Sequence, residues 1–250
     1  MTTERESEKQ IRAGPDHLAG LCRLGAFAAL LLLAYSLATM VQMVVLGGQP
    51  TSAAQAFDLL KNHRLVGLLR LDLPTVIVLP LYYLLFLGLY AALRRIDYAN
   101  VLLSTALAFV GLTLVLATPT ALSMLPLSDK FAAATSDAAR NQLLAAGEAI
   151  MAADIWHSTG AILGGVLFQA GAVLISVVML RGAVFTKTTA WLGIVMHALD
   201  LAHIVAGLFL PIAGVVLMAI AGPLYPFWFI LVGLRLLKLA SSKGQSYSAA

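Results

Sequence analysis

Long apolar stretches separated by short polar segments dominate the pattern along this chain. A helix needs about 20 mostly apolar residues to cross the hydrocarbon core of a bilayer. Six stretches reach that length, at residues 24–46, 65–93, 99–124, 157–180, 189–210 and 212–236. The first follows a charged segment, as in a signal peptide, but it is longer than the roughly 7–15 apolar residues of a signal-peptide core. The pattern therefore predicts an all-α integral membrane protein with six transmembrane helices, the first of them retained.

Two of the polar connections are long and carry a helical pattern of their own. Residues 51–64 include Ser52, a residue type that favours a helix N-cap, and continue as a short amphipathic helix. Residues 127–156 have the same character, with a second helix start at Ser136. We expect short amphipathic helices in both of these long loops.

The positions of lysine and arginine predict the orientation of the chain. Eleven of the 16 basic residues fall on the side of the two termini, four fall on the opposite side, and Arg70 falls inside a span. Because cytoplasmic loops carry the excess of basic residues, both termini should be cytoplasmic, and an even number of spans agrees. The sequence then divides into a cytoplasmic tail (1–17), a six-helix membrane domain (18–240) and a second cytoplasmic tail (241–250), in the plasma or inner membrane of a cell.

Composition narrows the class of protein. Hydrophobic residues make up 60% of the chain and charged residues 11%, whereas soluble domains are nearer half apolar and a quarter charged. The excess of lysine and arginine in the cytoplasmic loops explains the net charge of +4. We therefore expect lipid as the partner and no nucleic acid. The lone Cys22 excludes an internal disulfide and a cysteine-based metal cluster.

Three ionisable residues lie within the fifth predicted span: His197, Asp200 and His203. An ionisable group at the centre of a membrane helix costs about 2.5–3.5 kcal/mol, so such residues usually face a bundle interior or a wet cavity. The three residues share one flank of the helix but rise by about 9 Å in all, so one metal ion could take two neighbours and not all three.

Other polar residues are predicted at the same depth, in the outer half of the membrane. Arg70 and Asp72 lie in the outer third of the second span and His157 begins the fourth, with Gln169 deeper in the same helix. We predict an outward-facing pocket, provided that the second, fourth and fifth spans are neighbours. Its expected lining is Arg70, Asp72, His157, Asp200 and His203.

Several functions are compatible with such a pocket. The leading interpretation is a protein without enzymatic activity that binds a small or lipidic ligand, or uses the polar groups for helix packing. A metal-dependent hydrolase of membrane lipids is the main alternative, with a divalent metal such as zinc held by His157, Asp200 and His203. A proton-coupled carrier is a further alternative, because His and Asp chains also serve as proton relays. Haem binding is weaker, since only His157 is available opposite the fifth span.

Two segments resemble the bacterial multi-pass membrane family known as domain of unknown function 4386. The segment from Leu65 to Leu107 resembles its second and third helices, which show an early Arg, a following Asp and a Leu-Tyr pair; here these are Arg70, Asp72 and Leu89-Tyr90. The segment from His157 to Gly207 is similar to its later helix pair, although the usual proline of the basic turn is missing. Its matching positions are Gly160, Phe168, Arg181, Leu192 and Gly193. The resemblance implies an uncharacterised integral membrane protein and supplies no mechanism.

Overall fold

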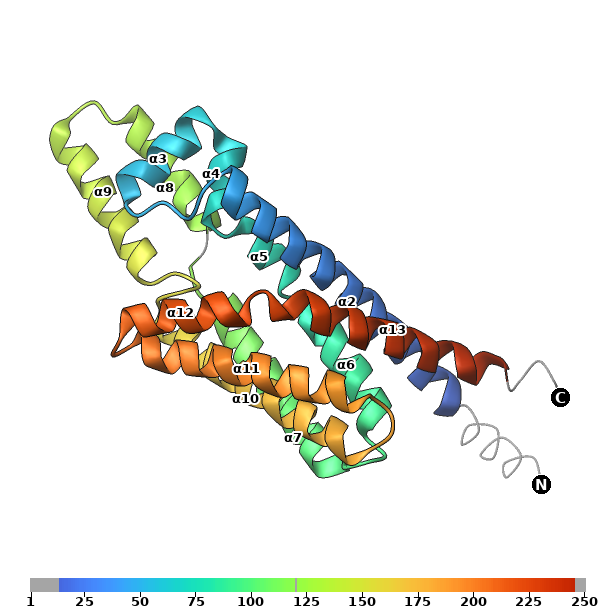
Figure 1. Cartoon of the computed structure of the whole chain (residues 1–250). Helices are drawn as coiled ribbons and strands as arrows, with labels where there is room; N and C mark the ends of the chain where they lie inside the picture. The colour runs from blue at the N-terminus through green and yellow to red at the C-terminus, as the bar shows by residue number, and fades with distance from the viewer. Residues whose placement is uncertain (1–13, 120, 246–250) are drawn as a thin grey trace, which may run out of the picture. The chain divides into compact units, whose positions relative to one another are not determined.

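The structure is a computed structural model that describes residues 14–119 and 121–245. Within these residues the chain forms helices and no strand (Figure 1). Most of the predicted tails, at residues 1–13 and 246–250, lies outside the described residues. The helices are α2 (Gly14–Val45), α3 (Ala53–Asn62), α4 (Arg64–Leu71), α5 (Leu73–Val78), α6 (Leu81–Leu93), α7 (Tyr98–Leu116), α8 (Ala121–Ala133), α9 (Asp137–Ala152), α10 (Thr159–Arg181), α11 (Lys187–Gly207), α12 (Pro211–Ala221) and α13 (Leu224–Gln245).

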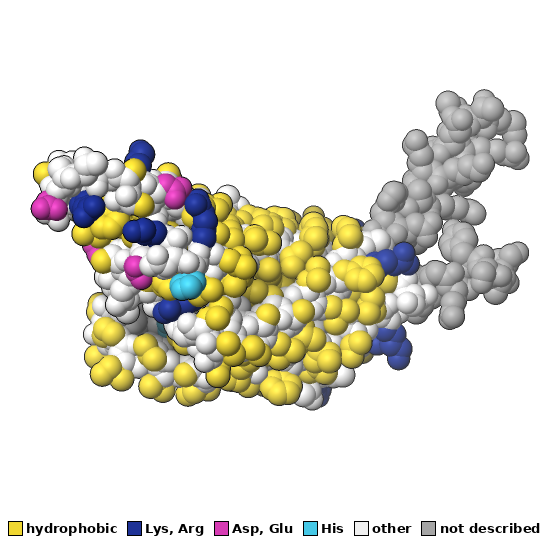
Figure 2. All heavy atoms as spheres, turned by 90° about the horizontal axis from the view of Figure 1, so that it is seen from above, with side chains coloured by type: hydrophobic (Ala, Val, Ile, Leu, Met, Phe, Trp, Pro, Cys, Tyr) yellow, Lys and Arg dark blue, Asp and Glu magenta, His cyan; other side chains and the backbone are white. Residues whose placement is uncertain are grey.

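The prediction of an all-α protein with six spans is confirmed. Six helical stretches among the described residues are long and apolar enough to cross a membrane: Leu18–Val45, Leu73–Leu93, Tyr98–Ala133, Thr159–Arg181, Lys187–Gly207 and Pro211–Ser241. Large apolar side chains are also exposed, with Val44, Phe209 and Ile212 more than three quarters accessible. Hydrophobic side chains cover a broad area of the face in Figure 2. Monomeric soluble proteins rarely expose apolar patches of this size, whereas lipid covers such surfaces in a membrane protein.

The second span differs from its prediction, which began at residue 65. Residues 64–71 form the separate helix α4, and the apolar span begins at Leu73. Asp72 breaks the helix with a non-helical backbone (φ −156°, ψ 8°), and Pro74 follows in the first turn of α5. Proline lacks an N–H, so it favours the first turn of a new helix over the interior of a continuing one.

Prolines also divide the last predicted span. α12 ends at Ala221 and α13 begins at Leu224, on either side of Gly222 and Pro223. Pro223 has no N–H to donate to the carbonyl of Ala219, so the regular helix cannot continue through it. A break therefore lies inside this span.

The helices form two compact units, each described by itself. The first unit contains residues up to Ala34, Leu81–Phe109 and residues from Phe168 onward. Its core includes the fully buried Trp228 and Phe86, and the Tyr82 and Phe168 rings meet edge to face at 4.9 Å. α11 and α12 run side by side as a hairpin (Figure 1), with Gly207 and Gly214 in close approach.

The second unit contains Tyr35–Pro80 and Val110–Leu167. Its short helices α3 and α9 come from the two long loops, whereas α8 is the end of the apolar stretch Tyr98–Ala133 and continues into the second loop. Both predicted N-caps are confirmed. The side chain of Ser52 accepts the N–H of Gln55, and that of Ser136 accepts the N–H of Ala139. α3 buries one face against its neighbours, in a cluster of Ala53, Ala56, Phe57, Leu60 and Met124.

Candidate functional site

A polar network joins three helices of the first unit. Gln169 of α10 donates through Nε2 to Asp200 Oδ2 at 2.8 Å, and the hydroxyl of Tyr225 in α13 donates to the same oxygen. Gln169 Oε1 lies 2.6 Å from Nδ1 of His197 in α11. The bond from Gln169 Nε2 to the Tyr225 oxygen, at 3.1 Å, closes the set. We call these four residues the polar network.

Local helix geometry explains the arrangement. His197 and Asp200 are three residues apart on α11, so they share one flank of that helix. Tyr225 lies in the first turn of α13, immediately after the break at Gly222 and Pro223. The break therefore brings the Tyr225 hydroxyl to a carboxylate on another helix.

Hydrogen-bond chemistry fixes the orientation of the groups. An ionised carboxylate only accepts, so Gln169 must turn its NH₂ group toward Asp200 and its carbonyl toward His197. His197 must then carry a proton on Nδ1 to donate to that carbonyl, and its Nε2 is an acceptor in the neutral ring. Among the described residues, His197 Nε2 is buried without a hydrogen-bond partner, as is Nε1 of Trp228.

Aromatic rings enclose the imidazole of His197, which is 1% exposed. The rings of Trp228 and Tyr225 lie nearly perpendicular to it, at 5.1 and 5.6 Å between centroids. Gly193, one turn earlier on α11, makes room for this packing, since a Cβ there would lie 2.6 Å from Trp228 Nε1 and 2.5 Å from Ser176 Oγ. The surroundings of His197 in the polar network are therefore tightly packed.

Two of the four residues of the polar network are more accessible than the other two. His197 and Gln169 are buried, whereas Asp200 and Tyr225 are only half-buried. Both hydrogen bonds to Asp200 end on Oδ2, and no group in the described part of the chain makes a hydrogen bond to Oδ1. Among the described residues Asp200 also takes part in no ion pair.

His203, the other predicted site residue in the first unit, has a different partner. Its Nδ1 donates to the carbonyl of Gly214 at 2.9 Å, which joins α11 to α12. Asp200 makes its hydrogen bonds with Gln169 and Tyr225 instead.

The remaining predicted site residues lie in the second unit. Asp72 is 5% exposed and accepts the N–H of Ala121 at 2.7 Å. Burial raises the pKa of its carboxyl to about 6, opposed by that hydrogen bond and assisted by the charge of Asp154. Arg70 Nε donates to the carbonyl of Gly48 at 2.8 Å. His157 Nδ1 lies 2.8 Å from Asp154 Oδ1, with most of its ring exposed.

The predicted pocket of Arg70, Asp72, His157, Asp200 and His203 thus has members in both units and stays a prediction. Across residues 14–119 and 121–245, no group of three His, Cys, Asp or Glu side chains could hold a metal ion. The zinc site of His157, Asp200 and His203 also stays a prediction, and metal analysis of the purified protein would decide it.

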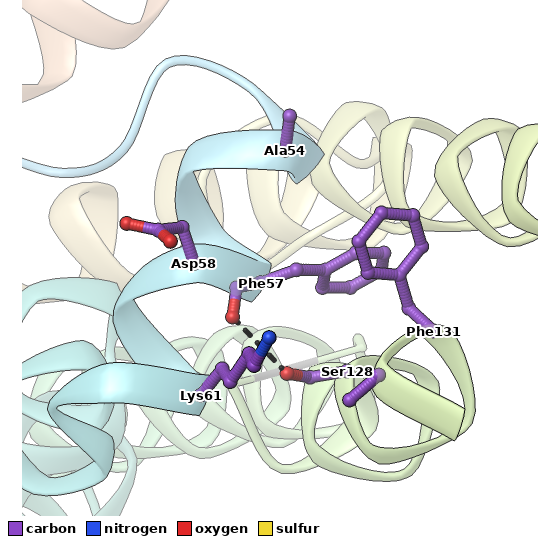
Figure 3. Close-up of a pocket in the computed structure, with 7 residues that line it drawn as sticks. Ala54, Phe57, Asp58, Lys61, Ser128 and Phe131 are labelled. Atoms are coloured by element: carbon purple, nitrogen blue, oxygen red, sulfur yellow. Dashed lines mark hydrogen bonds between the residues drawn. The ribbon is translucent and has the colours of Figure 1, made fainter. Parts of the chain in front are cut away.

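A surface hollow of about 270 Å³ lies elsewhere in the second unit, between α3 and α8 (Figure 3). Ser128 Oγ donates to the carbonyl of Phe57 at 3.3 Å beside it. Its lining shares no residue with the predicted pocket: Ala54, Phe57, Asp58, Lys61, Ser128, Phe131 and Ala132.

An ion pair and a hydrogen bond link the connections at one end of the first unit. Arg181 at the end of α10 pairs with Asp97, just before α7, and Arg235 Nε of α13 donates to the carbonyl of Val184. Hydrogen bonds from Asn100, and then the charge of Arg181, hold the pKa of Asp97 below its usual value. Two connections that the sequence assigns to the cytoplasmic side therefore lie at one end of this unit.

Comparison with known proteins adds no relative: no family model, no curated protein and no solved structure matches the chain.

Proposed function

We propose that this chain is a non-enzymatic, multi-pass protein of a bacterial plasma membrane whose polar groups bind a small or lipidic ligand. The polar network is the observation that supports this proposal. Its buried members, Gln169 and His197, join α10 to α11, and Asp200 and Tyr225 are half-buried. Polar side chains between membrane helices stabilise packing by about 0.6–2 kcal/mol each. A partly accessible carboxylate and phenol can also bind the polar group of a ligand. Membership of the family of domain of unknown function 4386 is part of the same proposal.

The proposed orientation places both termini in the cytoplasm and the pocket lined by Arg70, Asp72, His157, Asp200 and His203 on the outer side. The charge distribution supports it, as does the proximity of Arg181 to Asp97 in the first unit. A reporter that is active only in the cytoplasm, fused after Ala250, should be active. The same reporter inserted between Ala134 and Ser136 should be silent. The reverse pattern would overturn the orientation.

Ligand binding can be tested with lipids of defined chemistry. Protein in vesicles of phosphatidylethanolamine or phosphatidylcholine is released into detergent and weighed intact by native mass spectrometry. The ethanolamine headgroup has N–H donors and the choline headgroup has none, so we expect retained phosphatidylethanolamine on the wild type and less on Asp200→Asn. Asp129→Asn, at an exposed carboxylate of the second unit, is the control. Equal retention of both lipids by all three proteins would remove recognition of the headgroup by Asp200 from the proposal, and retention of neither lipid would remove lipid binding.

A proton-coupled carrier is the second candidate, because Asp200 lies in a membrane-spanning helix without an ion pair among the described residues. This function predicts proton flux into liposomes that Asp200→Asn abolishes and Asp129→Asn preserves. Flux that survives Asp200→Asn would exclude Asp200 from the mechanism.

A further inference from the structure

The hollow between α3 and α8 has charges of both signs beside an aromatic surface (Figure 3). Phe57 is 1% exposed, and its ring lies 5.3 Å from that of the half-buried Phe131. Figure 3 shows these rings at one side of the view and the Asp58 carboxylate at the other. Ser128, also buried, donates to the Phe57 carbonyl, so its hydroxyl oxygen keeps lone pairs for a further donor. A ligand in this hollow would meet both apolar and polar groups.

The two charged residues that line the hollow do not pair with each other. Asp58 and Lys61 are three residues apart on α3, a spacing at which opposite charges can meet on one helix face. Among the described residues, neither takes part in an ion pair. Oδ1 of Asp58 accepts a hydrogen bond from Nδ2 of Asn62 at 2.7 Å. A ligand with a cationic and an anionic group would therefore find an unpaired charge of opposite sign for each.

The size and position of the hollow narrow the class of ligand. Its volume of about 270 Å³ is below the roughly 300–1,000 Å³ of pockets for drug-sized ligands, so it suits a headgroup better than a whole lipid. α8 lies at the end of the apolar stretch Tyr98–Ala133, which is long enough to span a membrane. Lipid headgroups begin where such a stretch leaves the hydrocarbon core.

The spacing of the two charges also favours a headgroup. Asp58 and Lys61 are about 4.5 Å apart along the helix axis. A phosphoethanolamine group separates its phosphate from its ammonium by an oxygen and two carbons. An α-amino acid carries both charged groups on one carbon, so its charges lie closer together.

We propose that this hollow binds the zwitterionic headgroup of a phospholipid, with the phosphate on Lys61, the ammonium on Asp58 and the glycerol carbons against Phe131. The Lys61 ammonium donates to the phosphate, and the headgroup ammonium donates to the carboxylate. The inference rests on the proposed function only in taking a lipid as the ligand, and it does not involve Asp200. Asp200→Asn should therefore leave this site unchanged, which keeps a failure of one proposal apart from a failure of the other.

A soluble headgroup tests the two charges. Glycerophosphoethanolamine is titrated into the full chain in dodecyl maltoside, and binding is measured by NMR as saturation transferred from the protein to the ligand. We expect saturable binding that Lys61→Gln and Asp58→Asn each weaken about tenfold, because each removes a hydrogen bond to a charged group. The matched controls Lys130→Gln and Asp137→Asn, at exposed positions outside the lining, should bind as the wild type. Equal affinities of Lys61→Gln and Lys130→Gln would overturn the site.

Two further ligands test which chemistry is recognised. Glycerophosphoglycerol has the phosphate without the ammonium and should bind more weakly than glycerophosphoethanolamine. Tighter binding of free phenylalanine would indicate a soluble amino acid as the ligand and would overturn the headgroup assignment. All four replaced residues are exposed, so unchanged unfolding midpoints should show that the variants are folded.

Thiol labelling in bilayer discs tests the lipid itself. Ala132→Cys places a thiol in the lining and Ala133→Cys places one beside it on α8, both in a Cys22→Ser background. A water-soluble maleimide should label Ala132→Cys severalfold more slowly in phosphatidylethanolamine than in phosphatidylglycerol. Ala133→Cys should react at the same rate in both lipids. Equal rates for Ala132→Cys would contradict occupancy of the hollow by a zwitterionic headgroup.

Discussion

Gly25 of α2 and Gly88 of α6 meet backbone to backbone. A Cβ on Gly25 would lie 2.7 Å from the Cα of Gly88, and a Cβ on Gly88 would lie 2.8 Å from the Cα of Gly25. Neither clash can be relieved by rotating a side chain, since both involve main-chain atoms. Gly88→Ala should therefore force the helices apart and cost about 1–3 kcal/mol of stability, as overpacking does.

The matched control is Gly20→Ala, on the same helix as Gly25 but with nothing within 4 Å of its added Cβ. Replacing an unhindered helical glycine by alanine is expected to stabilise by roughly 0.5–1 kcal/mol. The two variants should thus shift the thermal midpoint in opposite directions. A Gly88→Ala protein as stable as the wild type would show that the two helices do not pack this closely.

Gly193 is expected to be sensitive for a different reason. Its added Cβ would meet side-chain atoms, Ser176 Oγ and Trp228 Nε1, which can move at some cost. Gly193→Ala should lower stability by about 1 kcal/mol and alter the emission of Trp228 as the indole is displaced. Gly207→Ala, on the same helix with an open position, should not lower stability and should leave the emission unchanged. Unchanged emission from Gly193→Ala would contradict the contact.

Gln169 is expected to be the most sensitive member of the polar network. Gln169→Leu removes the donor to Asp200 and the acceptor for His197, and each unsatisfied buried group costs about 1–3 kcal/mol. Thermal unfolding in detergent should show a clear loss of stability. Gln142→Leu, at an exposed position of α9, should be close to neutral. Equal midpoints for both variants would mean that the network contributes nothing to packing.

Asp72 should make stability depend on pH. Its pKa in the folded protein, about 6, exceeds the ordinary value of 3.8, so folding favours the protonated form. The corresponding stability is fully present below about pH 4 and is lost as the pH rises through 6, by up to about 3 kcal/mol. Unfolding midpoints measured from pH 4 to 8 should fall for the wild type and fall less for Asp72→Asn. Asp129→Asn should behave as the wild type, and a wild-type profile that rises with pH would refute the assignment.

The sequence predicted the number of spans because the length of an apolar run is a local property. It also predicted the caps at Ser52 and Ser136, which depend on one side chain and the next turn of backbone. The predicted start of the second span was wrong. The mostly apolar composition continues on both sides of Asp72, whereas the helical backbone is interrupted at this residue. Hydropathy averages over such a position, whereas proline and a polar residue at the break determine where the helix begins.

The candidate site was predicted less well. Asp200 was expected to be important, yet its partners Gln169 and Tyr225 lie 31 and 25 residues away in the sequence. His197 was expected outside the pocket lining, and the structure links it to Asp200 through Gln169. A lone glutamine in the apolar run of α10 and a tyrosine directly after a Gly-Pro break were the available signals. To predict that these two residues meet Asp200, one must know which helices are neighbours, and residue spacing along a single helix does not show that.

The contact between Glu148 and α3 bears on how the chain is made. Glu148 Oε1 accepts the N–H of Ala53 at 2.8 Å, across 95 residues of sequence. During synthesis α3 leaves the ribosome long before α9, so this end of α3 lacks its carboxylate partner until two further membrane segments have emerged. Contacts of such long sequence separation form late and slowly. The second unit, which ends at Leu167, should therefore become resistant to protease only after α9 has emerged, and the first unit, which also needs the residues from Phe168 onward, should follow it.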